Sequence, residues 1–438
     1  MPTSIEQVRA RVASQKTLLP ALYGQVDFDR TPERWTDDAS VALVKERSPM
    51  GISPSQHDLD LVRAYTMLGD IVADAYAALL PRYGPGRLVK MLQQACEQGV
   101  EKVADAPPEL AAFIRDMERI PDWVDLDLVR EGARLDLNAT ANVAPFAIRG
   151  AFIATFLNKY SALPMALTGT LSNQTAAHRV RETAHFFACT VLPGALDRHG
   201  AGFKAAAMVR LMHSMVRVNV LSTGKWDPEV YGVPIPQVDQ MPAGLIPVFL
   251  LAFRMLREGR REFTPGERAQ VELARYRCFL LGLPDDLLAD TPEGIVRMMS
   301  ARNSTLRDGF DDETCGSLVR ATLAAYLPQD ESWPNLIHDQ LERRFAKLIF
   351  VEHFLGGNRE IAAKIGIQIT PDDVVFGTMV GAGIALQMKV FEIAESIPGV
   401  REIASAFLKW RVEQLIAAYG HAKFTTDASK YRPTAAAA

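Results

Sequence analysis

The chain has 438 residues, of which 48% are hydrophobic and 23% charged, and its formal net charge is −4 at pH 7. These values are ordinary for a soluble globular protein, and the length is sufficient to bury a large core. The slightly negative charge gives no basic footprint for nucleic acid, so we expect no nucleic-acid partner.

Cysteine spacing and apolar runs exclude further classes. The four cysteines form no Cys-x-x-Cys pair, which argues against a disulfide framework, a zinc ribbon and covalently attached c-type haem. The first residues, MPTSIEQVRARVASQK, lack the apolar core of a signal peptide. The two most apolar runs, 242–253 and 374–388, are shorter than the roughly 18 residues that span a bilayer. We therefore expect no transmembrane segment and a cytoplasmic location, or a secreted one if this is a trimmed mature chain.

Helical periodicity runs through the chain, without a convincing run of alternating strand residues. In the first half we predict helices at residues 4–17, 57–81, 86–103, 108–118, 125–137, 174–192 and 203–221, with a central apolar segment at 139–158 and breaks at Pro164 and Gly169. In the second half we predict helices near 243–258, 265–281, 292–304, 313–326, 335–356, 372–395 and 398–419. Because there is no internal repeat and no low-complexity linker, the pattern predicts one large all-α domain.

The predicted helix at 203–221 carries the strongest functional signal. Most of its circumference is apolar, as in a buried helix, but Arg210, His213 and Arg217 recur at i, i+3 and i+7 and share one face. Buried charges need partners. The arginines can pair with acids of neighbouring helices, or this face can bind a cofactor. A histidine for iron beside arginines for propionates fits haem b better than zinc, which requires three or four converging ligands.

The preceding helix, HRVRETAHFFACTVL, carries a second polar face. Arg179, Glu182, Thr183 and Phe186 lie at i, i+3, i+4 and i+7. A carboxylate and a hydroxyl that face an iron could steer dioxygen or move protons. The alternative is a solvated face with an Arg–Glu helix pair. Glu182 and His185 also form an ExxH motif, but a bundled di-iron site needs two such motifs and the spacing occurs once.

Three segments, RVRET, RLMHSMVR and GVPIPQVDQ, follow one another in this order. Together they resemble the ER-bound oxygenase and rubber-oxygenase catalytic domain family, which includes the bacterial latex-clearing proteins. The resemblance extends over about residues 120–360. On this basis we expect residues 1–119 and 361–421 to be helical additions to a family-like core. The tail at 422–438 ends in PTAAAA, so we expect it to be flexible.

The resemblance implies an all-α fold that encloses haem b between the 174–192 and 203–221 helices. It makes His213 the proximal iron ligand, places Arg179 and Thr183 in the haem pocket, and lets Arg210 and Arg217 flank the ligand helix. The latex-clearing members use dioxygen to cleave the carbon–carbon double bonds of polyisoprene. Other members act on smaller isoprenoid or lipid-like molecules.

The chain departs from the rubber-cleaving pattern at Glu182, where those proteins carry a lysine beside the haem, and in lacking a visible export signal. We therefore expect a haem b-dependent oxygenase that uses dioxygen to oxidise or cleave a hydrophobic small molecule or polymer, without committing to rubber. Glu182, Thr183 and Arg179 are the candidate catalytic residues, and the apolar segments 139–157 and 243–256 offer the substrate lining. The alternatives are a non-catalytic haem or lipophilic-ligand binding protein and a helical scaffold without a cofactor.

Overall fold

Several helices begin at residues that cap them. In the computed structural model, which describes residues 4–32, 51–169 and 175–420, Ser4, Ser55, Thr264 and Thr370 each accept a hydrogen bond from the third backbone N–H of the helix that follows. The side chain at that third position reaches back to the cap, so both ends of each capping box are satisfied. These starts follow directly from local sequence.

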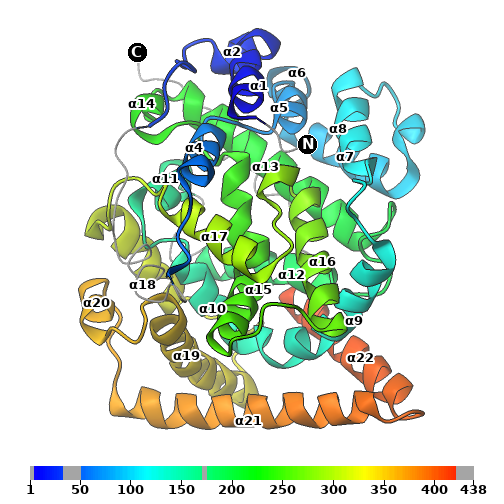
Figure 1. Cartoon of the computed structure of the whole chain (residues 1–438), viewed down its shortest axis with the longest axis vertical. Helices are drawn as coiled ribbons and strands as arrows, with labels where there is room; N and C mark the ends of the chain where they lie inside the picture. The colour runs from blue at the N-terminus through cyan, green and yellow to red at the C-terminus, as the bar shows by residue number, and fades with distance from the viewer. Residues whose placement is uncertain (1–3, 33–50, 170–174, 421–438) are drawn as a thin grey trace.

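The described residues form helices and turns, with no strand among them, so the predicted all-α class is confirmed. Figure 1 shows the helices gathered around α13, with α21 along one end of the molecule. The helices are α1 (Ile5–Leu18), α2 (Pro20–Tyr23), α4 (Gln56–Tyr65), α5 (Ile71–Ala77), α6 (Leu80–Tyr83), α7 (Pro85–Gln98), α8 (Pro108–Glu118), α9 (Leu126–Asn142), α10 (Ala144–Ala154), α11 (Lys159–Thr168), α12 (Ala176–Cys189), α13 (Ala201–Ser222), α14 (Pro228–Tyr231), α15 (Gln240–Arg257), α16 (Pro265–Leu280), α17 (Pro292–Asn303), α18 (Ser317–Ala324), α19 (Trp333–Phe354), α20 (Arg359–Lys364), α21 (Pro371–Ser396) and α22 (Arg401–Tyr419).

The single helix predicted at 57–81 is wrong, because the chain turns between α4 and α5. A Cβ at Gly69 would lie 2.1 Å from the Tyr23 hydroxyl oxygen, so only glycine allows this close approach. Asp70 then caps α5 by accepting a hydrogen bond from the backbone N–H of Ala73. The break at Pro164 is also wrong, since this residue lies inside α11, which ends at Gly169 in the left-handed conformation.

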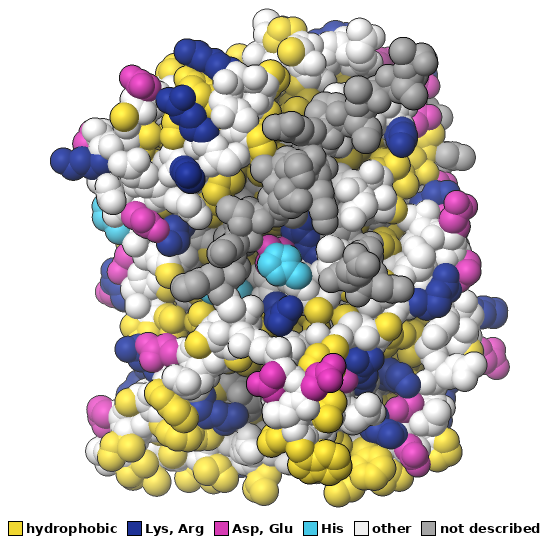
Figure 2. All heavy atoms as spheres, turned by 180° about the vertical axis from the view of Figure 1, so that it is seen from behind, with side chains coloured by type: hydrophobic (Ala, Val, Ile, Leu, Met, Phe, Trp, Pro, Cys, Tyr) yellow, Lys and Arg dark blue, Asp and Glu magenta, His cyan; other side chains and the backbone are white. Residues whose placement is uncertain are grey.

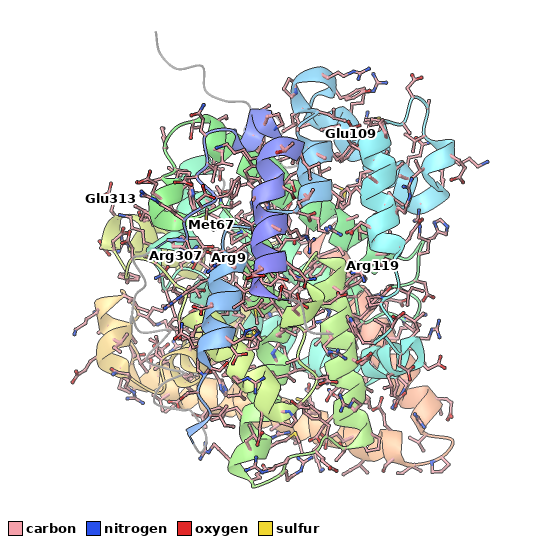
Figure 3. All side chains as sticks on the ribbon, turned by 45° about the horizontal axis from the view of Figure 1, so that its top comes forward. Arg9, Met67, Glu109, Arg119, Arg307 and Glu313 are labelled. Carbon is pink, nitrogen blue, oxygen red and sulfur yellow. The ribbon has the colours of Figure 1, made fainter. Side chains whose placement is uncertain are left out.

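Buried apolar side chains form two clusters that together fill the single domain. The larger one surrounds α13 and includes residues of α5, α7 and α16, and the smaller one lies among α10, α12, α18 and α19. Met67 and Arg307, both labelled in Figure 3, are buried in the body of the protein. Arg307 lies 3.5 Å above the centre of the Tyr160 ring, where a cation and an aromatic face attract each other.

The segment predicted to be central, 139–158, contains α10 and a fully buried charge. Arg149 donates to the Glu342 carboxylate at 2.7 Å and to the backbone oxygens of Thr322 and Ala325 at 2.6 and 2.8 Å. Asp339 lies 3.4 Å away from the same guanidinium. The one charge in this apolar segment is therefore paired inside the core, as burial of an ion requires.

The expectation that both apolar runs are too short for a bilayer needs correction. Within the described residues, the helical stretches Gln237–Arg257 and Pro371–Ser396 are each long and apolar enough to cross a membrane by length and composition. Half of the most apolar window in the first stretch is buried inside the protein, whereas only 11% of that window in the second is buried. The first is a core helix, and the second requires another explanation.

Candidate functional site

His213 lies in the second half of α13, on the face that meets α12 and the start of α15. Burial, reinforced by the positive charge of Arg217, lowers the pKa of His213 to about 4, so its imidazole is neutral at neutral pH. Its Nδ1 lies 3.1 Å from Nε2 of the Gln240 amide. Metal ligation through the other nitrogen, Nε2, requires the proton to be on Nδ1. The Gln240 side chain can accept the hydrogen bond from this Nδ1–H if its amide presents the oxygen.

The two arginines that share this face are held by acids from distant segments. Arg210 donates from Nε and Nη2 to both oxygens of Asp70 at 2.6 and 2.8 Å, and its Nη2 lies 2.9 Å from Asp116. Burial alone would raise the pKa of Asp70, but Arg210 outweighs it and the pKa is lowered. Arg217 lies 3.3 Å from Asp74 and so is also paired. The pairing of these arginines with acids, one of the two interpretations left open by the sequence, is thus realised.

The α12 face contains a buried ion pair instead of a solvated one. Nη1 of Arg179 lies 2.8 Å from the Glu182 carboxylate, and these side chains are only 8% and 5% exposed. The same guanidinium lies 3.5 Å from the sulfur of Met212, next to His213, and its charge contributes to the low pKa of the imidazole. The Arg179 and Glu182 side chains and the imidazole of His213 therefore belong to one site.

His178 joins this site from the protein surface. Its Nε2 lies 2.9 Å from the second oxygen of Glu182, and its own side chain is 47% exposed. Sequence reasoning missed this contact, although the i, i+4 spacing on one helix could have revealed it. Thr183, on the next position of α12, is partly buried, whereas Phe186 is buried in the core.

The segment GVPIPQVDQ at 232–240 supplies the remaining wall. Ile235 has a φ of 47°, which is rare for a β-branched residue, and its carbonyl oxygen accepts a hydrogen bond from Arg217 at 2.9 Å. Asp239 accepts hydrogen bonds from Tyr160 and from Arg302. Gln240 then begins α15 beside His213. The sequence singled out this segment, but it gave no sign of which side chain meets the histidine.

These residues fit a haem held by one histidine. The imidazole is neutral and surrounded by protein, and yet His213 and Met212 keep partly accessible surface in a helix whose neighbouring residues are mostly buried. Among residues 4–32, 51–169 and 175–420, no group of three or more His, Cys, Asp or Glu could hold a metal ion. Haem needs no such group, because its iron is held by the porphyrin and can take a single histidine as its protein ligand.

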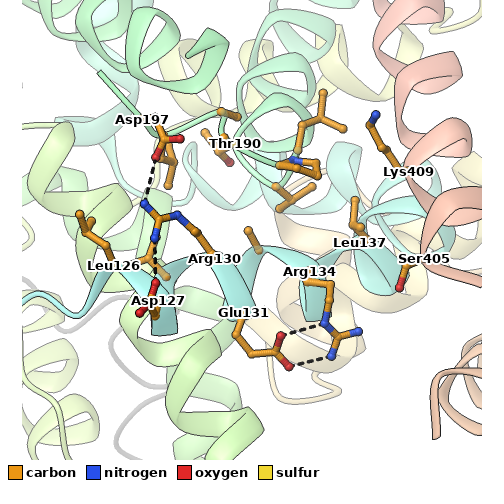
Figure 4. Close-up of a pocket in the computed structure, with 18 of the residues that line it drawn as sticks. Leu126, Asp127, Arg130, Glu131, Arg134, Leu137, Thr190, Asp197, Ser405 and Lys409 are labelled. Carbon is orange, nitrogen blue, oxygen red and sulfur yellow. Dashed lines mark hydrogen bonds and ion pairs between the residues drawn. The ribbon is translucent and has the colours of Figure 1, made fainter. Parts of the chain in front are cut away.

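A separate cavity lies away from His213. It measures about 530 Å³ and is bounded by α9, by α22 and by the turn that follows α12 (Figure 4). Its walls are mainly apolar, and its arginines are paired, Arg130 with Asp127 at 2.8 Å and Arg134 with Glu131 at 2.7 Å. His213 does not line it. Thr190, which does, lies about 16 Å along α12 from Arg179 at 1.5 Å per residue.

Comparison with known proteins gives two matches. Residues 139–350 match the family model described as "ER-bound oxygenase mpaB/B'/Rubber oxygenase, catalytic domain". Among solved structures, the chain is similar to one described as "Structure of Latex Clearing Protein LCP in the closed state", with a TM-score of 0.56 and 17% sequence identity, over 81% of this chain and 91% of that one. At this identity the likeness shows a shared fold. None of the curated proteins compared with the chain matches it.

Proposed function

Because the chain belongs to the ER-bound oxygenase mpaB/B'/Rubber oxygenase catalytic-domain family, we propose that it is a haem b-dependent oxygenase that uses dioxygen to oxidise or cleave a hydrophobic, isoprenoid- or lipid-like substrate. His213 is the observation that carries this proposal. It is a neutral imidazole on the central helix, with Nδ1 in contact with Gln240 and Nε2 left as the candidate iron ligand. The matched residues include the whole of α12, α13 and the 232–240 segment.

Each polar residue of the site has a separate role in this proposal. His213 would hold the iron, Arg179 and Thr183 would line the haem pocket, and Arg210 and Arg217 would act on cofactor binding by fixing the helix that carries His213. Their guanidinium groups already have protein carboxylates as partners, so their contribution is to position the ligand helix. The bound haem would supply the iron that activates dioxygen.

The stoichiometry of the reaction is simple if a double bond is cleaved. One carbon–carbon double bond and one dioxygen give two carbonyl groups, with both oxygen atoms retained, so no external reductant is consumed. What the protein must add is a dry site and control of protons. The apolar helices α10 and α15, whose side chains belong to the two buried clusters, are the candidates for keeping that site dry.

Glu182 and His178 form a path for protons between solvent and the site. Glu182 is buried, and its two oxygens contact Arg179 on one side and the half-exposed His178 on the other. A proton taken up at His178 can pass from Nε2 to the Glu182 oxygen 2.9 Å away, which lies in the site. In this role an acid replaces the lysine that the rubber-cleaving proteins carry, and it makes the site more negative.

The test is dioxygen consumption by the haem-loaded protein with a series of alkenes, from short isoprenoids and unsaturated fatty acids to polyisoprene. We expect uptake with at least one of them, with a carbonyl product for each double bond lost. Glu182→Gln and His178→Gln should lower turnover by about 10- to 100-fold, with an unchanged absorption spectrum. His57→Gln, on the exposed side of α4, serves as the control and should leave turnover unchanged.

Protein that binds haem but consumes no dioxygen with any of these compounds would contradict catalysis and favour a non-catalytic haem or lipophilic-ligand binding protein. Turnover that is the same in wild type and Glu182→Gln would instead remove Glu182 from the proton path and leave the oxygenase proposal intact.

A further inference from the structure

Helix α21 is apolar and yet lies at the surface. It runs along one end of the molecule in Figure 1, and residues 374–388 within it contain no charged side chain. Only 11% of its most apolar 18-residue window is buried in the protein. A helix that is hydrophobic around its whole circumference normally requires apolar surroundings on all sides. The body of the protein provides them on one side only.

The side of α21 that faces the body is narrow and tightly fixed. A Cβ at Gly377 would lie 2.5 Å from a terminal carbon of Leu348 in α19, so the two helices approach closely at this glycine. Lys347 pairs with Asp373 at 3.0 Å near the start of α21, and Asn138 donates to the Met388 carbonyl oxygen at 3.0 Å further along. The helix therefore lies flat against the body along its length and cannot cross a bilayer as a separate span.

Exposed apolar side chains recur along the other sides of α21 and along α22, with the exposed Lys389–Glu392 pair and Arg401 among them. Of the 16 large hydrophobic side chains that are exposed among the described residues, 11 lie between residues 375 and 410. Figure 2 shows hydrophobic side chains collected along this end of the molecule. The α21–α22 apolar surface consists of Val375, Phe376, Met379, Leu386, Val390, Ile393, Ile397, Val400, Ile403, Phe407 and Trp410.

The two helices hold this surface together through stacked rings. Phe391 of α21 lies parallel to Phe407 of α22 at 5.8 Å, and Phe407 in turn contacts Trp410 at 5.5 Å. Trp410 is 52% exposed. Tryptophan is enriched where proteins meet the headgroup region of a membrane, because its ring is apolar and its N–H is polar. Lys409, beside it, is also about half exposed.

We propose that the α21–α22 apolar surface docks the protein onto a lipid bilayer, with α21 parallel to the membrane plane. A contiguous exposed apolar patch larger than a few hundred Å² marks a protein or a membrane contact. Two features favour lipid. Acyl chains can surround a rod that is exposed on several sides, whereas a folded partner covers one face. A protein contact also has a polar rim with matched hydrogen bonds, whereas the stretch 374–388 contains no charged group and the exposed pair Lys389–Glu392 follows only after it.

Docking in this orientation would bring the 530 Å³ cavity to the edge of the membrane. Ser405, Ala406 and Lys409 of α22 line that cavity, and Phe407 and Trp410 of the same helix belong to the apolar surface. Figure 4 shows Ser405 and Lys409 on the α22 side of the cavity. A lipophilic molecule dissolved in the bilayer would then reach the cavity without crossing water.

The test is flotation of the full chain with phosphatidylcholine vesicles on a density gradient. We expect the protein to float with these uncharged vesicles and to remain bound at high salt, because apolar contact is insensitive to screening. The double variant Met379→Glu/Leu386→Glu should bind at least about tenfold more weakly, since two apolar side chains that are 64% and 67% exposed become charged. Leu18→Glu, at a 58% exposed position of α1, is the matched control and should float like the wild type.

Two further measurements keep the test decisive. Ile403→Glu/Phe407→Glu repeats it on α22, and thermal unfolding of each variant verifies that it folds. A wild-type chain that stays out of the vesicle fraction, or variants that still float, would overturn the proposal. A dimer in light scattering that the α21 variant dissociates, with no vesicle binding by the wild type, would assign the surface to a second copy of the chain. Neither result depends on haem or on turnover.

Discussion

Replacing Asp70 with asparagine isolates the charge that holds Arg210. Asparagine caps a helix about as well as aspartate, so the start of α5 should be retained. Arg210 is 3% exposed and would keep only Asp116, whose side chain is 41% exposed. Removal of one partner from a buried ion pair costs about 3–5 kcal/mol, because the remaining charge is left uncompensated. Here we expect the lower end of this range.

This loss of stability translates into a measurable change in melting temperature. Unfolding entropy of about 2.1 cal/mol/K per residue gives roughly 0.9 kcal/mol/K for 438 residues, so about 3 kcal/mol corresponds to a decrease of about 3 °C. Circular dichroism of the haem-free protein measures it. Asp285→Asn, which removes the exposed partner of Arg119, should lower the melting temperature by less than about 1 °C. Equal melting temperatures for the two variants would show that Arg210 does not rely on Asp70.

Burial raises the pKa of Glu342 to about 7, so the folded state binds more protons than the unfolded state between pH 4.5 and 7. As the pH rises over this range, the free energy of unfolding measured with urea should therefore fall by about 1–3 kcal/mol more for wild type than for Glu342→Gln. Parallel curves of this free energy against pH for the two proteins would contradict the prediction. Gln240→Leu removes the contact to Nδ1 of His213 and should weaken haem binding by about 10- to 100-fold in a titration, with unchanged folding. Gly132→Ala places a Cβ 2.1 Å from a carbonyl oxygen of α16 and should destabilise the folded protein by about 1–3 kcal/mol. Gly86→Ala in α7 meets no atom within 4 Å and should leave stability unchanged or raise it by up to about 1 kcal/mol. Similar free energies of unfolding for the two variants in denaturant would disprove the close packing at Gly132.

The helices could be predicted from the sequence where local signals determine them. Apolar periodicity and capping residues place α13 and α16 within a few residues of their observed bounds. The break at Gly69 could not be predicted, because it depends on the close approach of Tyr23, far away in the chain. At Pro164 the local signal predicted a break that does not occur, because α11 accommodates this proline in its interior.

The candidate site was only partly predictable for the same reason. The spacing of Arg210, His213 and Arg217 on one face is a local pattern, and it indicated a buried polar site. Their partners are not local: Asp70 is 140 positions from Arg210 in the chain, so no periodicity relates the two. The sequence therefore left open whether the arginines meet acids or a cofactor, and the ion pairs to Asp70 and Asp74 show the acids.

The exposed position of α21 also follows from tertiary structure alone. The apolar run at 374–388 is visible in the sequence, but it resembles a core helix in every local respect. Only the packing shows that α19 covers one narrow side and leaves residues such as Met379 and Leu386 mostly accessible. Apolar composition predicts that a helix needs apolar surroundings, and it does not say whether protein or lipid supplies them.

Binding of haem b by His213 is tested by the absorption spectrum of the purified protein, recorded for wild type and for His213→Ala. We expect a strong Soret band that converts to the pyridine complex of haem b and is lost or shifted in the variant. His199→Ala, at a histidine whose Nδ1 contacts the carbonyl oxygen of Cys96, is a control that should keep the wild-type spectrum. A colourless wild-type protein that remains colourless after haem is added would show that His213 binds no haem. The Arg–His–Arg face of α13 would then be a structural ion-pair network without a cofactor.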